Sequence, residues 1–467
     1  MSPPLSTLEK ALDVNLDDSL YGTFAEIGAG QEVVRWFFRA GAAAGTISKS
    51  ISAYDMKVSD AIYGTCQRYV CRERLEAMLA CEQRLNRDRL TETRGDSTRF
   101  FSFADTVSAR NYLGTNNCHA WMGIRFQSAS HGEDNTIIVH VRMLDDTNVL
   151  QQEALGLVGV NLIHGALKGD ADPLKLVASL LDGLSAQRLE IDMIDFQGPS
   201  YAAVDNRVMS LKLVELGLSG AAMFAADGTV LQPSQALRKR SLIIERGRFR
   251  PVTHVNMDML ASAIAKFDDV VDDANRDPLP IMEISMHSLS GDGDVCLQDF
   301  VSRADVLAAT GHTVMISDFP EYYRLMAYLS RYTDRTIGMA MGIGMLRSLF
   351  DARHYEHLDG GILESLGRLF KDSLKLFIYP QRVPDSEQLD TLSDIHLDDG
   401  LQHLFAYLKE RGSIVELANI RQEYLDIHSP QVLEMIGEGK DEWQAMVPDC
   451  VAQAIVSRKL FGYRPSP

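Results

Sequence analysis

Three short segments of this sequence alternate ionisable and apolar residues. In residues 281–287, single apolar residues separate Glu283, Ser285 and His287. Successive side chains of a β-strand point to opposite faces, so these three residues are expected to share one face. A carboxylate and an imidazole on one face can move protons on a bound substrate. We therefore predict that Glu283 and His287 form a catalytic acid–base pair.

Two other strand-like segments show the same alternation. His140 and Arg142 share one predicted face, and Glu190 and Asp192 share another. Buried ionisable groups are costly unless they are paired or face water, so polar strand faces of this kind indicate a site. We predict catalytic roles for Asp192 and Asp195, which would orient the substrate or bind a cation. His140, Glu190 and Asp192 have the side chains that hold a divalent cation, which is the candidate cofactor.

Other residues near the ends of predicted strands suit an anionic substrate. Guanidinium groups bind phosphate or carboxylate through paired hydrogen bonds, and Arg142 and Arg246 are the candidates for this role. Asp318 and Lys49 are predicted to line the same substrate site. The alternative is a network of buried ion pairs, for example between Arg142 and Glu190, which would produce nearly the same sequence pattern.

A cluster of cations interrupts this acidic chain. Its members, within thirteen residues, are Arg238, Lys239, Arg240, Arg246, Arg248 and Arg250. Such a cluster can steer an anionic substrate. A solvated helix end followed by a loop is the alternative interpretation.

A further strand-like segment, residues 119–127, carries three polar or aromatic side chains at alternate positions. His119, Trp121 and Arg125 share its predicted face. We interpret them as an exposed face of a sheet.

Residues 24–32, FAEIGAGQE, place a glycine pair between a short apolar segment and a helix-like one. This arrangement directs a helix N-terminus toward an anion or a nucleotide. It resembles the first motif of class I S-adenosylmethionine-dependent methyltransferases, in which an acidic residue precedes a glycine pair. The resemblance implies that Gly28 and Gly30 approach the cofactor. Glu32 occupies the third glycine position of that motif, which is a departure from it.

Strand-like and helix-like segments alternate from about residue 137 onward, which is typical of repeated βα units and predicts a parallel sheet. About eight such units fit a (β/α)8-like barrel, and an open doubly wound sheet is the alternative. We predict a helical N-terminal region at 1–100, an α/β core with the site at 101–383, and an acidic helical C-terminal region at 384–467. A long charged helix is expected within residues 67–92.

The composition argues against several classes of protein. A net charge of −18 and a pI near 5.1 argue against a nucleic-acid or membrane-surface partner. No run of about 18 apolar residues is present, so no membrane-spanning helix is expected. The six cysteines lack metal-ligand spacing and the N-terminus lacks signal-peptide features, so we expect free thiols in the cytoplasm.

Phrases along most of the chain resemble a widespread, largely uncharacterised bacterial family of similar length. They include YGTFAEIGAGQEVVRWFF, VDNRVMSLKLVELGL and ISDFPEYYRLMAYLSRYT. Automated labels name some members of that family nicotinate-nucleotide adenylyltransferases. This sequence lacks the HxGH and ISxTxxR motifs of such enzymes, so the resemblance implies a family and no mechanism.

Together, these features favour a cytoplasmic enzyme, either a transferase or a hydrolase, acting on an anionic small metabolite. The substrate class would be a nucleotide or phosphate ester, and the chemistry would be acid–base or metal-assisted. One alternative is a non-catalytic metabolite sensor or oligomeric scaffold, in which the long charged helix and the acidic tail form homo-oligomer contacts. A second alternative is an S-adenosylmethionine-dependent methyltransferase.

Overall fold

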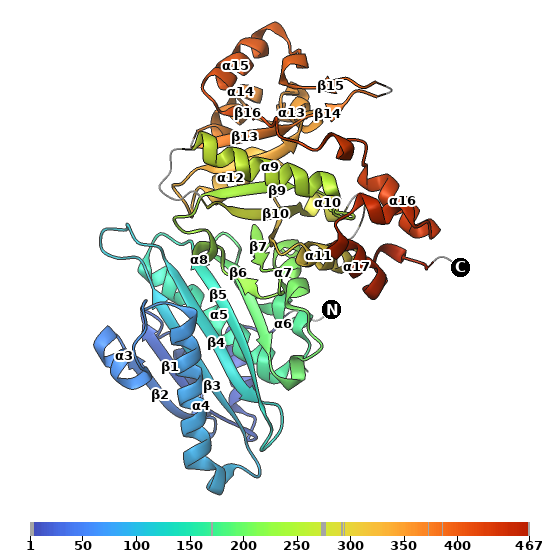
Figure 1. Ribbon diagram of the computed structural model, residues 1–467. Coiled ribbons are helices and arrows are strands. Elements are labelled where there is room, and N and C mark those ends of the chain that lie inside the picture. Colours follow the sequence, from blue (N-terminus) through green and yellow to red (C-terminus); the bar gives the residue numbers. More distant parts are fainter. Residues whose placement is uncertain are drawn as a thin grey trace. The chain divides into compact units, whose positions relative to one another are not determined.

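The computed structural model describes residues 4–169, 171–271, 277–290, 293, 295–371, 373–384 and 386–465. The chain divides into two compact units, Met1–Ala222 and Met223–Pro467, and the boundary falls inside strand β7 (Ala221–Phe224). Two open sheets provide the frameworks of the two units (Figure 1). Within the described ranges, no helix is long and apolar enough to cross a membrane.

The first unit contains a six-stranded sheet in the order β2-β1-β3-β4-β5-β6. β1 is parallel to β2 and β3, whereas β3, β4, β5 and β6 are successively antiparallel. The strands are β1 (Leu20–Gly28), β2 (Ile47–Ala53), β3 (Arg99–Ser108), β4 (His119–Gln127), β5 (Asp134–Met143) and β6 (Leu189–Gln197). The helices are α1 (Thr7–Asn15), α2 (Val33–Ala40), α3 (Met56–Tyr63), α4 (Arg72–Arg94), α5 (Asn148–Lys168), α6 (Pro173–Ser179) and α7 (Asn206–Glu215).

The two faces of this sheet differ in chemistry. On one face, Phe103 of β3 and Val139 of β5 belong to an apolar core with Val33 of α2 and Val158 of α5. On the other face, α4 packs along β1, β3 and β4 (Figure 1). The α4 face is polar, because its charged helix meets side chains such as Ser102 of β3. This polar face positions most of the candidate residues of the first unit.

The second unit contains an eight-stranded sheet in the order β16-β13-β12-β9-β10-β11-β7-β8. β16, β13, β12, β9, β10 and β11 are parallel, and β7 pairs with β8 in the antiparallel direction. The strands after β7 are β8 (Val230–Leu231), β9 (Leu242–Arg246), β10 (Leu279–Ser285), β11 (Thr313–Ser317), β12 (Ile337–Gly342), β13 (Leu374–Tyr379) and β16 (Ile414–Glu416), with β14 (Gln381–Arg382) and β15 (Leu389–Asp390) forming a separate hairpin. The helices are α8 (Pro233–Leu237), α9 (His254–Val270), α10 (Met286–Ser290), α11 (Leu297–Ala309), α12 (Tyr322–Leu329), α13 (Ile343–Leu349), α14 (Gly361–Leu369), α15 (Asp399–Glu410), α16 (Ser429–Glu438) and α17 (Asp449–Arg458).

The α/β class is confirmed, and no closed barrel forms among the described residues. β5 and β6 are antiparallel although two helices separate them, so the parallel pairing predicted for them is wrong. Alternation reports which faces a strand presents, but it does not report the strand's partner or direction. Residues 1–100, predicted to be helical, also contain β1 and β2, and the predicted limits at 100 and 383 lie inside the two units.

Candidate functional site

A β-bulge shapes the polar face of the first unit. His140 of β5 pairs with Met193 of β6, but Val141 pairs with Ile191, so Asp192 is the additional residue. A bulge reverses the alternation and turns a side chain in a new direction. This places Asp192 against His140 and keeps Asp195, three residues later, on the same face.

A continuous hydrogen-bonded chain links three side chains on this face. His140 Nδ1 lies 2.5 Å from Asp192 Oδ1, and His140 Nε2 lies 3.0 Å from His119 Nδ1. His140 and Asp192 are only 1% and 0% exposed, whereas His119 is partly exposed. The Trp121 ring covers His140 at a centroid distance of 4.8 Å. We call Asp192, His140 and His119 the relay.

The hydrogen bonds of the relay specify where its protons lie. With Asp192 ionised, His140 carries its proton on Nδ1, and the Nε2 atom of a neutral His140 then accepts a hydrogen bond from the N–H group at His119 Nδ1. The Nε2 atom of His119 is left with its lone pair at the partly exposed end. Burial, followed by the positive charge that His140 carries when it is protonated, lowers the pKa of His119 to about 4. His119 is therefore neutral at pH 7 and has the form of a base.

The other carboxylates of this face are held by arginines. Arg142 forms an ion pair with Glu190, and Glu190 Oε1 also lies 3.0 Å from the Ser219 hydroxyl. Arg72 of α4 lies 2.5 Å from Asp195. These pairs correspond to the ion-pair interpretation of the sequence pattern. They occupy Arg142, Glu190 and Asp195 with structural partners.

The predicted metal set does not assemble as a cluster. Glu190 is bound to Arg142, while His140 and Asp192 bind each other. Within the part of the chain that the structure describes, no group of three or more His, Cys, Asp or Glu side chains could hold a metal ion.

Gly28 ends β1 and Gly30 lies between β1 and α2, as the sequence predicts, but an internal carboxyl group occupies the N-terminus of α2. Glu26 accepts hydrogen bonds from the backbone N–H groups of Val33 (2.9 Å) and Val34 (3.3 Å). A Cβ atom on Gly30 would approach Asp105 Oδ1 to 2.2 Å. Gly30 thus permits close packing over a buried carboxyl. This geometry does not support a cofactor role for Gly28 and Gly30.

In the second unit, Glu283 and Arg246 form a buried ion pair. Arg246 Nε lies 2.6 Å from one oxygen of Glu283, and a terminal guanidinium nitrogen lies 3.1 Å from the other. The Ser317 hydroxyl donates to the same carboxylate at 2.5 Å, and the carbonyl groups of Phe319 and Pro320 accept the remaining Arg246 bonds. Internal partners therefore surround the guanidinium predicted to hold an anion.

The structure does not place His287 beside Glu283. β10 ends at Ser285, and His287 lies in the short helix α10 with an exposed side chain. The prediction that this strand extends to His287 is wrong. The backbone becomes helical at Met286, so the side chains beyond it no longer alternate between two faces of a sheet. Asp318 follows β11 and is exposed.

Lys49 belongs to β2 of the first unit, a strand that its sequence did not predict. Its ammonium group lies 2.5 Å from Glu82 of α4, which also accepts a hydrogen bond from Tyr63 (2.8 Å). The ion pair of Lys49 and Glu82 thus links the edge strand β2 to the charged helix α4. The predicted substrate-binding residues Lys49 and Arg246 fall in different units.

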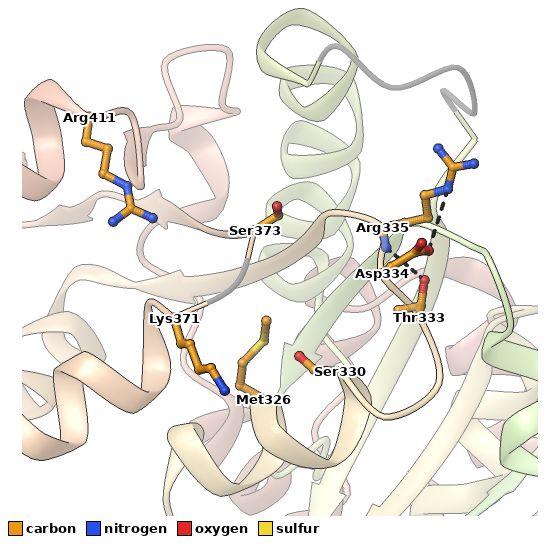
Figure 2. A pocket seen from close by; sticks show the side chains of 8 residues that line it. All are labelled: Met326, Ser330, Thr333, Asp334, Arg335, Lys371, Ser373 and Arg411. Atoms are coloured by element: carbon orange, nitrogen blue, oxygen red, sulfur yellow. Dashed lines mark hydrogen bonds and ion pairs between the residues drawn. The ribbon is translucent and has the colours of Figure 1, made fainter. Parts of the chain in front are cut away.

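A cavity of about 520 Å³ lies in the second unit at the ends where β12, β13 and β16 begin (Figure 2). Its cations, Arg335, Lys371 and Arg411, follow the C-terminal ends of α12, α14 and α15. Arg411 donates to the carbonyl of Phe370 at 3.4 Å, at the end of α14. Lys371 and Arg411 directly follow helices and compensate the negative ends of the helix dipoles, whereas Arg335 lies beyond α12 and pairs with Asp334 at 4.0 Å. Helix ends and Asp334 therefore compensate part of the positive charge that lines the cavity.

Sequence reasoning did not identify His119 as a functional candidate, and it placed Glu245 at the carboxyl end of a strand without giving it a role. His119 was assigned to an exposed sheet face, although its alternation with Trp121 correctly placed it opposite the apolar core. Glu245, at the end of β9, is fully buried; it accepts a hydrogen bond from Asn256 at 2.7 Å, and burial raises its pKa to about 8. A charged residue inside the apolar run SLIIERG was the available signal for Glu245.

No family model and no curated protein matches this chain. Among solved structures, the competence/damage inducible protein CihA from Agrobacterium tumefaciens is 13% identical, with a TM-score of 0.25 over 35% of this chain and 96% of that one. A competence-damaged protein (CinA) superfamily protein from Enterobacter cloacae is 16% identical, with a TM-score of 0.27 over 36% and 96%. TM-scores this low do not establish a shared fold, so these structures assign no fold or activity to this chain.

Proposed function

We propose that this protein is an enzyme acting on an anionic small metabolite, such as a nucleotide or phosphate ester, with His119 as its general base. The observation that carries the proposal is the relay from Asp192 through His140 to His119, at 2.5 and 3.0 Å. A buried carboxylate behind two histidines has no packing advantage over apolar residues. Such a chain suits proton transfer at its exposed end.

The relay can take a substrate proton without leaving a charge on His119. His119 Nε2 accepts the proton, and His119 Nδ1 passes its own proton to His140 Nε2. The positive charge then lies on His140, whose Nδ1 is 2.5 Å from the Asp192 carboxylate. The reverse transfer returns the proton to a leaving group, so the same residues serve as base and acid.

Arg68 is the candidate for holding the substrate anion beside His119. Its side chain is exposed and has no ion-pair partner among the described residues, and its positive charge makes the smallest of the contributions to the pKa shift of His119. Arg142 also lies beside His119 in the strand register, but Glu190 neutralises it. A free guanidinium near a base can orient a phosphate through two hydrogen bonds.

The test is turnover of named phosphate compounds followed by ³¹P NMR. AMP, ADP, glucose 6-phosphate and p-nitrophenyl phosphate would be incubated with the wild-type protein and with His119→Gln. We expect conversion of at least one compound, and a loss of about 10²–10⁴-fold in rate for His119→Gln, the usual contribution of a general base. Arg68→Gln should raise KM more than it lowers kcat.

The matched control is His131→Gln, which alters an exposed histidine of the same unit, 2.8 Å from Asp96. It should leave both rate and melting temperature unchanged. Wild-type turnover by His119→Gln would contradict the role of His119. Absence of conversion of every compound would contradict the proposed substrate class.

A further inference from the structure

The cluster of cations in residues 238–250 is divided by strand β9. Arg238, Lys239 and Arg240 precede β9, whereas Arg248 and Arg250 follow it. The second pair therefore lies beyond the carboxyl end of a parallel strand, the edge at which α/β sheets bind ligands. Helix α11 also begins at this edge, because it follows β10, the parallel neighbour of β9.

Two arginines share one carboxylate at the start of α11. Arg250 Nε lies 2.6 Å from Asp299 Oδ1, and a terminal nitrogen of Arg303 lies 2.5 Å from Asp299 Oδ2. Arg303 also donates to the carbonyl groups of Arg248 (3.2 Å) and Ser288 (3.0 Å). These bonds fix the Arg303 guanidinium against the chain that leaves β9.

The positive charge of this cluster is not balanced. Arg248 is exposed and has no ion-pair partner among the described residues. Arg303 is 4% exposed, and its Nε atom has no acceptor in the described chain. Burial, opposed by Asp299, lowers the pKa of Arg303, and the positive charges of Arg250 and Arg248 lower it further. Arg250 and Arg303 thus share the single carboxylate of Asp299, and with Arg248 beside them the cluster has an excess of positive charge that a bound anion would relieve.

The first turn of α11 adds to this field. α11 spans 13 residues, and its N-cap residue Cys296 makes no side-chain hydrogen bond to the helix. The first N–H groups of a helix have no partner within the helix and carry partial positive charge. Because Asp299 belongs to this turn, the arginines and the N–H groups of α11 lie at the same place.

We propose that the exposed side chains of Arg248 and Arg250 and the first turn of α11 bind the phosphate group of a small phosphorylated metabolite, while the buried Arg303 holds Asp299 in place and adds its positive charge. Phosphate is the class of anion that several guanidinium groups and a helix N-terminus together recognise. This site belongs to the second unit and does not depend on the relay. A diphosphate can contact both exposed arginines more fully than a single phosphate can.

The test uses the full chain and isothermal titration calorimetry with inorganic phosphate, pyrophosphate and AMP at constant ionic strength. We expect pyrophosphate to bind more tightly than phosphate. Arg248→Gln and Arg250→Gln should each weaken pyrophosphate binding by about tenfold, and together by about a hundredfold. The exposed Arg248 and half-exposed Arg250 are preferred to Arg303, because replacement of that buried side chain could unfold the unit.

The matched control is the double variant Arg238→Gln with Lys239→Gln, which removes two exposed cations of the same cluster before β9. It should retain wild-type affinity. Equal weakening in the control would show a nonspecific charge effect and overturn the proposal. An absence of wild-type binding, or unchanged binding by the Arg248→Gln/Arg250→Gln variant, would also overturn it. Neither result depends on turnover by the relay.

Discussion

Buried carboxyl groups are the most informative single residues of the first unit. Glu26 and Asp105 are register partners on the adjacent strands β1 and β3, and both are buried. Burial raises the pKa of Glu26 to about 8, although its bonds from Val33 and Val34 oppose the shift. Burial and the nearby Glu26 charge also raise the pKa of Asp105 well above its usual range. Because these two neighbouring carboxyl groups resist ionisation in the folded state, the free energy of unfolding should depend on pH.

The folded protein should lose stability as the pH rises toward 8 because of Glu26. Its pKa is about 8 when folded and 4.5 normally, so the folded state binds the proton more tightly. The stabilisation that this bound proton contributes is fully present below about pH 4.5 and is lost as the pH rises through about 8. Glu26→Gln cannot ionise, so it should be more stable than the wild type at pH 8.5, by an amount on the order of 2 kcal/mol.

Urea unfolding at pH 5 and pH 8.5 measures this difference. Glu92→Gln, which removes an exposed carboxylate of α4, is the control and should keep the wild-type pH dependence. If Glu26→Gln keeps the same dependence as the wild type, the pKa of Glu26 is not raised.

At the scale of elements, the ion pair of Glu283 and Arg246 joins two parallel strands. The two residues are register partners on β10 and β9, and Arg246 also binds the carbonyl groups after β11. The pair therefore connects three consecutive segments of the sheet. The same contacts that make it structural leave neither side chain available for a substrate.

Glu283→Gln should therefore destabilise the second unit rather than act mainly on turnover. Loss of one partner leaves the Arg246 guanidinium, 11% exposed, without its counter-ion. Breaking a buried pair in this way costs about 3–5 kcal/mol. Urea unfolding followed by circular dichroism measures the loss.

Glu364→Gln provides a matched control, because it breaks the more exposed pair between Glu364 and Arg368. That change should cost less than about 1 kcal/mol. Unchanged stability with abolished turnover in Glu283→Gln would instead restore the catalytic role predicted from the sequence.

At the scale of the whole molecule, the chain is two compact units with separate sheets. Each unit has its own buried strands, so each can unfold as a cooperative unit. The candidate residues of the relay belong to the first unit, and the arginines around Asp299 belong to the second. The proposed acid–base site with His119 and Arg68, and the further phosphate site proposed around α11, thus belong to different units.

Calorimetric melting should consequently resolve into two components. Glu283→Gln should lower the melting temperature of one component, and Glu26→Gln at pH 8.5 should raise that of the other, because the residues share no partners. The wild-type scan at the same pH is the reference. A single transition shifted by both variants would show that the two units unfold together.

Alternation in the sequence was sufficient to locate most strands and the polar face that carries His140 and Arg142. Alternation is a local property, since each side chain points opposite to its neighbours. It also marked Glu283 and Asp192 as unusual, because ionisable groups rarely occupy buried strands.

Only the tertiary structure decided which contacts these residues make. The bulge at Asp192 brings that carboxylate to His140, and the pairing of β9 with β10 brings Arg246 to Glu283. Both contacts join residues 37 or more positions apart in sequence. Strand order, strand direction and bulges depend on packing between distant segments, so an alternating pattern cannot distinguish a proton relay from an ion pair.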